Sequence, residues 1–120
     1  FDKTNAKLLA DSWLFAKERL KSLNVIGRSL NNDPEDAKLI KQYINIAFSA
    51  FEWDEVIRGI KKADEAGLED DGKFALMKGI AYFEKKSITN AKNSFIEASN
   101  SKEYKDQGIA WLEYLEALNG

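Results

Sequence analysis

The sequence predicts an all-α protein: a superhelix of about three helical hairpins followed by a C-terminal capping helix, about seven helices in all. The chain has a single Pro, and few of its β-branched residues alternate with polar ones as they would in strands. A pattern of small and aromatic residues also recurs at a step of about 35 residues, a period typical of stacked helical hairpins. Because one such hairpin cannot bury its apolar face alone, the pattern favours an array with a binding surface.

Composition is that of one folded domain and excludes several classes of function. At 120 residues, 44% of them hydrophobic, the chain is long enough for a domain with a core. It has neither Cys nor His, which excludes disulfides, thiolate or imidazole metal sites, and Ser-His or Cys-His catalysis. Although 32% of the residues are charged, the net charge is only −2, which argues against a general nucleic-acid or anionic-membrane binder. We therefore expect no enzymatic activity, cofactor, metal site or nucleic-acid partner.

No segment is predicted to insert into a membrane. The apolar runs fall short of the ~18 residues that a spanning helix needs, and the N-terminus lacks a basic region followed by an apolar one. Because the chain begins at Phe1 without a Met, we expect a processed chain or a C-terminal fragment of a longer protein.

Turn and capping residues divide the chain into its elements. Asp33 is predicted to cap the helix that follows, with Pro34 at the first helical position. Gly67 follows a predicted helix end, where a left-handed residue is common. Ser87 and Ser101 are predicted N-caps of later helices. The resulting boundaries are three repeats at about 3–33, 35–68 and 71–101 and a capping helix at about 102–118.

The third repeat carries the clearest form of the pattern. Its small and aromatic positions, which let two antiparallel helices pack closely, are Gly79, Tyr82, Ala91, Phe95 and Ala98. A step back of 35 positions from the last four lands on Ala47, Val56, Ile60 and Ala63. A further step of 34 lands on a weaker copy, Trp13, Ser22, Ile26 and Ser29. A generic helical bundle shows the same apolar spacing within one helix, but the recurrence favours an array.

The last predicted helix is amphipathic. Its apolar stripe consists of Trp111, Leu112, Leu115 and Leu118, with charged residues elsewhere on the helix. A terminal repeat would otherwise expose an apolar face, so this helix is expected to act as a solvating cap.

The pattern and its period resemble the tetratricopeptide repeat (TPR), a helix-turn-helix unit of about 34 residues. Nearly the whole chain also resembles TPR proteins encoded beside bacterial TonB energy-transduction systems. The residues that carry this similarity are 76–83, 91–95 and 111–116, with Trp13 and Trp53. The resemblance implies a non-enzymatic, periplasmic protein that supports an envelope transport complex.

The TPR resemblance also implies where a ligand would bind. In TPR proteins fixed positions on the first helix of each hairpin line a concave groove. Transferred through Gly79, these positions predict a basic rim, which would attract an acidic peptide or partner protein, and an apolar floor for its apolar side chains. The predicted groove residues are Lys7, Asp11, Leu14 and Phe15 from the first repeat, Lys38, Lys41, Asn45 and Phe48 from the second, and Lys73, Leu76, Ile80, Phe83 and Glu84 from the third.

Other interpretations stay open from the sequence. The groove lysines could be ordinary solvated residues, and Phe48 and Phe83 could pack between helices. The 35-residue step also suits a pentatricopeptide-like RNA-binding module, which would need a basic groove. A structural role, as the cap of a longer array or as a self-association module, is a third possibility. The acidic clusters at 33–36 and 69–71 are interpreted as helix-start and linker charges, not as metal ligands.

Overall fold

The computed structural model describes the backbone of residues 3–119 and the side chains of residues 17–119. Over that backbone the chain is all-helical and has no strand, which confirms the predicted class. Six helices follow one another in the described part: α1 (Lys3–Asn32), α2 (Ala37–Ser49), α3 (Trp53–Glu65), α4 (Lys73–Glu84), α5 (Ile88–Ser99) and α6 (Lys105–Asn119).

The N-terminal helix α1 is continuous where the sequence predicts a hairpin. The predicted first hairpin, and with it the count of about seven helices, is therefore wrong. Between its ends α1 has no Pro and a single Gly, Gly27. A glycine inside a helix costs about 1 kcal/mol relative to Ala but does not end the helix. The helix ends at Asn32, two residues before Pro34, which disfavours helical geometry in the residue that precedes it.

The next four helices form two hairpins with the same turn. Phe51 after α2 and Lys86 after α4 lie 35 positions apart and have φ angles of 60° and 64°. Their N–H groups donate to Phe48 O at 3.1 Å and to Phe83 O at 2.9 Å, the pattern of a Schellman C-cap. The hairpins α2–α3 and α4–α5 therefore repeat in backbone conformation as well as in residue character.

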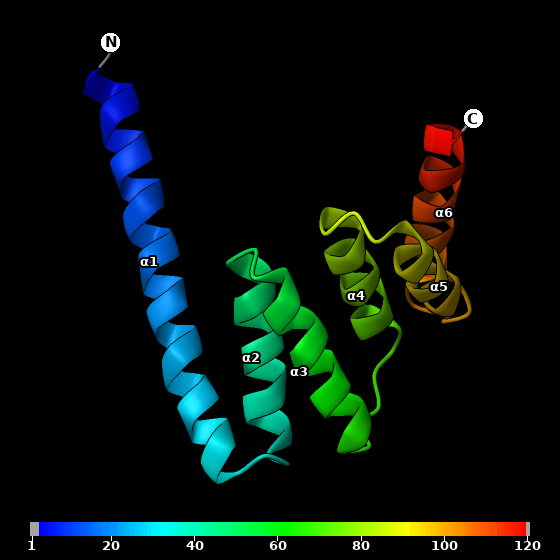
Figure 1. Ribbon diagram of the computed structural model, residues 1–120, viewed down its shortest axis with the longest axis horizontal. Coiled ribbons are helices and arrows are strands. Elements are labelled where there is room, and N and C mark those ends of the chain that lie inside the picture. Colours follow the sequence, from blue (N-terminus) through cyan, green and yellow to red (C-terminus); the bar gives the residue numbers. More distant parts are fainter. Residues whose placement is uncertain (1–2, 120) are drawn as a thin grey trace.

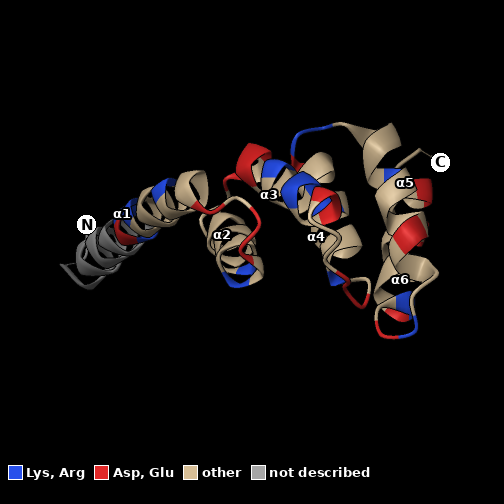
Figure 2. Cartoon of the chain, turned by 90° about the horizontal axis from the view of Figure 1, so that it is seen from below, with Lys and Arg blue, Asp and Glu red and all other residues tan. Residues whose placement is uncertain are grey.

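The helices are arranged as an open, layered array. Each packs chiefly on its neighbours in sequence (Figure 1). Figure 2 shows α2, α4 and α6 along one side, called here the even face, and α3 and α5 along the other, the odd face. The Cα radius of gyration, 16.4 Å, exceeds the roughly 13.6 Å expected of a compact chain of this length. Nearest-neighbour packing and an open shape are the features of a helical-repeat architecture.

Two hydrophobic clusters stabilise the array. The first contains residues from each of the helices α1, α2, α3 and α4. Its buried members are Leu23, Leu30, Ile40, Ile44, Ala47, Val56, Ile60, Ala63, Phe74, Met77 and Ala81. The second joins α4, α5 and α6 through buried Ala91, Phe95 and Leu115, with half-buried Leu76, Ile80, Tyr82, Phe83, Trp111 and Leu112 around them. Burial of the apolar pattern positions in α2, α3 and α5 confirms that they are packing residues.

On α1 the buried positions lie one residue beyond the predicted ones. Leu23 and Leu30 are 6% and 2% exposed, whereas Ser22 is exposed and Ser29 is half-buried. The step from α3 to these leucines is thus 33 positions instead of 34. The predicted register of the first copy is wrong because leucines, which gain from leaving water, take the core side in place of the serine hydroxyls.

Close packing of the last three helices centres on Phe95 of α5, which has no exposed surface. One side of its ring faces Gly79 of α4, where an added Cβ would lie 2.5 Å from Cε1 of the ring. Phe95 also stacks on Trp111 of α6, with ring centroids 4.9 Å apart and planes 6° from parallel. The packing around Phe95 thus involves residues outside the α4–α5 hairpin, because Trp111 of α6 covers one side of its ring.

The helix ends agree with the predictions only in part. Gly67, the residue after the C-cap of α3, has φ 70° and adopts the predicted left-handed conformation. The cap of α2 is Asp36 and not Asp33, because its Oδ1 accepts a hydrogen bond from Leu39 N at 3.0 Å. Pro34 correspondingly lies in the turn before the helix and not at its first position.

Candidate functional site

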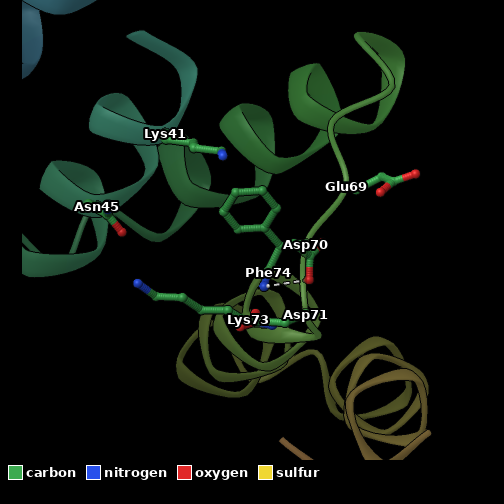
Figure 3. A pocket seen from close by; sticks show the side chains of 7 residues that line it. All are labelled: Lys41, Asn45, Glu69, Asp70, Asp71, Lys73 and Phe74. Carbon is green, nitrogen blue, oxygen red and sulfur yellow. Dashed lines mark hydrogen bonds between the residues drawn. The ribbon is translucent and has the colours of Figure 1, made fainter. Parts of the chain in front are cut away.

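Three predicted groove residues converge on one cavity of about 450 Å³ on the even face. Lys41 and Asn45, one helical turn apart on α2, and Lys73, the first residue of α4, surround the same space (Figure 3). The buried ring of Phe74 also lines this cavity, called here the lysine cavity. Because α2 and α4 are the first helices of the two repeated hairpins, the cavity is a product of their stacking.

Three acidic residues of the α3–α4 connection also line the lysine cavity, so its rim carries both signs of charge instead of being basic. Asp70 Oδ1 accepts hydrogen bonds from Gly72 N at 2.6 Å and from Phe74 N at 3.4 Å. Asp71 Oδ1 accepts one from Lys73 N at 3.3 Å. Both carboxylates are therefore held at the start of α4, where the helix dipole favours negative charge. Glu69 points away from the two lysines (Figure 3).

The lysine ammonium groups are available for an external anion. Among the side chains described, the four ion pairs within 4.0 Å involve neither Lys41 nor Lys73. Both residues and Asn45 are exposed, so solvent and a ligand can reach them. Two ammonium groups and one amide N–H₂ can donate to a single carboxylate, with the charge assistance that strengthens such hydrogen bonds.

A second cavity on the same face, of about 330 Å³, is lined by Phe83, Ala110, Trp111 and Tyr114 and is called here the aromatic cavity. Ring centroids are 5.3 Å apart for Phe83 and Trp111, and 5.8 Å apart for Phe83 and Tyr114. Tyr114 is 49% exposed, which leaves an apolar surface open to solvent. Phe83 belongs to the predicted groove. The α6 residues were missed because the sequence pattern assigns this helix only a capping role.

The other predicted groove residues are distributed differently. Leu76 and Ile80 are half-buried in the second cluster, on the stretch of α4 between the two cavities. Phe48 packs against the first cluster and makes an edge contact with Trp53 at 5.5 Å, so the packing interpretation holds for it. Lys38 and Glu84 are exposed and line neither cavity. Lys7, Asp11, Leu14 and Phe15 fall outside the described side chains.

The two cavities lie at opposite ends of one helix. Lys73 and Phe83 are ten residues apart on α4, a separation of about 15 Å along the helix axis. An extended peptide advances roughly 3.3 Å per residue and would cover this distance in four to five residues.

The described residues lack two further features. None of the helices there combines the length and apolarity that crossing a bilayer requires. The described acidic side chains form no group of three or more that could hold a metal ion.

Comparisons with protein-family models, with curated proteins and with solved structures found no match to this chain.

Proposed function

We propose that the chain is a TPR-type, non-enzymatic scaffold that binds an extended acidic peptide, or an acidic segment of a partner protein, across its even face. The observation that carries the proposal is the convergence of Lys41, Asn45 and Lys73 from two successive hairpins on one cavity. In this proposal a ligand carboxylate lies between the two ammonium groups and accepts from the amide of Asn45.

The aromatic cavity supplies the second contact of the same ligand. An apolar side chain four to five residues from the acidic one reaches Phe83, Trp111 and Tyr114 as the peptide crosses Leu76 and Ile80. Aromatic rings give such a contact a large apolar area at little conformational cost, which is why they dominate binding energy at interfaces. Charge at one end and apolar area at the other would fix the direction of the peptide.

A capping role for α6 fits the same proposal. Tyr114 stands 35 positions after Gly79 of α4, the position that lets Phe95 of α5 pack closely there. A phenol ring in that place opposes similar packing of a further helix on α6. This argues against array extension or self-association through that face and favours a ligand on the even face.

An RNA-binding function is the alternative, and the charges of the even face oppose it. A polyphosphate backbone would need basic residues along the whole groove. Here Glu69, Asp70 and Asp71 line the same cavity as the two lysines, and the net charge of the chain is −2. A salt-sensitive shift of single-stranded RNA, without any protein partner in a pull-down, would favour this alternative.

A narrower proposal, a periplasmic accessory role beside a TonB-type transport system, is supported by the sequence resemblance alone. Genome neighbourhood tests it: absence of TonB-type genes beside this one would contradict the narrower role and leave the peptide-binding proposal intact.

The binding proposal is tested with labelled Ser/Gly peptides that carry one Glu and one Phe, measured by fluorescence polarisation. We expect the peptide with about four residues between Glu and Phe to bind more tightly than one with the two adjacent. Lys41→Gln with Lys73→Gln should weaken binding about five- to thirtyfold, as two exposed charge contacts of about 0.5–1 kcal/mol each predict. The matched control, Lys61→Gln with Lys102→Gln, removes the same charge from exposed positions outside both cavities. Equal loss in both double variants, or no binding of any peptide, contradicts the proposal.

A further inference from the structure

A third cavity, of about 420 Å³, lies among α1, α2 and α3 and has no role in the proposed peptide site. Its lining includes three cationic side chains, two amides and no carboxylate. The lining residues are Asn24, Gly27, Arg28, Leu30, Asn31, Tyr43, Arg58 and Lys62. A cavity with this lining, called here the arginine cavity, is a candidate site for an anion.

Helical spacing brings the polar groups of the arginine cavity together. Asn24, Arg28 and Asn31 follow one another at four and three residues and so share one face of α1. Arg58 and Lys62 are one turn apart on α3, so both helices direct donors into the same space. Gly27 leaves the space between α1 and Tyr43 open, because it has no side chain. A Cβ at this position would lie 3.4 Å from Tyr43 Cε2.

One of the three cations is already paired. Arg58 Nη1 lies 3.3 Å from Glu55 Oε1, and the Tyr43 hydroxyl donates a hydrogen bond to the same carboxylate. Burial and this hydrogen bond raise the pKa of Tyr43 well above its ordinary value, so the phenol stays a neutral donor. Glu55 thus reduces the charge around the cavity from +3 to +2. Within the described side chains, no carboxylate lies within 4.0 Å of the other two cations, Arg28 and Lys62.

We propose that the arginine cavity binds a phosphate group, either inorganic phosphate or the phosphate of a small monoester. A phosphate dianion matches the residual charge of +2, and its oxygens suit the planar donor fork of Arg28 and the ammonium group of Lys62. The amides of Asn24 and Asn31 can donate to the remaining oxygens. Acidic groups flank the site, since Glu35 and Glu65 line an adjoining hollow that shares Lys62. They would repel a continuous polyanion, which favours a small ligand over a nucleic acid.

The test is a two-dimensional amide NMR titration of the whole chain with inorganic phosphate and, separately, with phosphoserine, at constant ionic strength. Shifts confined to α1 and α3, saturating with either ligand, are the expected result, and comparison of the two affinities distinguishes free phosphate from a monoester. Arg28→Gln with Lys62→Gln should weaken binding at least about tenfold.

The matched control for this titration is Lys21→Gln with Lys61→Gln, which removes the same charge from the same two helices outside the cavity. Equal weakening in both double variants, or no saturable shift with either phosphate, overturns the proposal. Tighter binding of single-stranded RNA through the same residues overturns it in favour of a nucleic-acid site. Circular dichroism spectra of all variants establish that they are folded, and peptide binding at the even face should be unchanged by Arg28→Gln with Lys62→Gln.

Discussion

Replacement of Gly79 by Ala tests whether close helix approach at Phe95 stabilises the array. The new Cβ would lie 2.5, 2.6 and 2.9 Å from the Cε1, Cδ1 and Cζ atoms of the Phe95 ring. Ordinary carbon contacts are about 3.5–4.0 Å, so the ring would have to move by about 1 Å. It has little room to move, because it is fully buried and stacked on Trp111 with centroids 4.9 Å apart.

The expected magnitude for Gly79→Ala follows from two opposing effects. Overpacking of a filled core costs about 1–3 kcal/mol, and three contacts under 3.0 Å place this site in the upper half of that range. The better helix propensity of Ala returns about 1 kcal/mol. The net loss should be about 1–2 kcal/mol. For a chain of 120 residues this corresponds to about 4–8 °C in Tm. Thermal and guanidinium unfolding followed by circular dichroism at the helix band measure it.

Gly27→Ala in α1 is the matched control, because it makes the same substitution inside a helix without the clash. The added Cβ would lie 3.4 Å from Tyr43 Cε2, at the edge of ordinary contact. This variant should therefore gain about 0.5–1 kcal/mol from helix propensity. If Gly79→Ala proved as stable as the parent, or if both variants changed Tm equally, the close approach of α4 to Phe95 would not be the constraint described.

Two other predictions concern single side chains. Because burial and the hydrogen bond to Glu55 raise the pKa of Tyr43 above about 10, the folded state keeps this proton longer than the unfolded state. The free energy of unfolding should therefore fall as pH rises above about 10. Tyr43→Phe should lessen this fall and should lower the free energy of unfolding by about 1–2 kcal/mol at neutral pH. Guanidinium unfolding of both proteins from pH 7 to 11 measures the effect, and the same fall in both would contradict the reasoning. Lys86→Gly should stabilise by about 0.5–1 kcal/mol, since exposed Lys86 has φ 64° and Gly adopts this conformation without strain; a melting curve without any gain would show that the turn is unstrained.

Sequence patterns predicted burial and backbone conformation best at residues whose role depends only on their own helix or turn. The apolar pattern positions of α3 and α5 are buried as predicted, because their spacing dictates which face of each helix is apolar. Gly67 was predicted correctly because few other residues adopt its conformation at low cost. The first hairpin was wrong because no residue between Lys3 and Asn32 ends a helix, and the repeat pattern was extended there without such a signal.

The candidate sites could be predicted only in part. The TPR resemblance predicted Lys41, Asn45, Lys73 and Phe83 as groove residues, and the structure shows that the first three line one cavity and Phe83 another. Neither Tyr114 nor the arginine cavity follows from the sequence pattern. Their neighbours come from helices far apart in the chain, and the packing angles of those helices are not encoded in the periodicity of any one of them.

By itself, the sequence determined the helical class, the 35-residue recurrence of the two hairpins and the apolar face of most helices, because these depend on spacing along one chain segment. Tertiary structure decided that α1 packs in a register one residue from the predicted one, that acidic residues share the lysine cavity, and that α6 supplies rings to the even face. These features depend on how helices stack, since burial of their combined apolar surfaces sets which side chains from different helices come together.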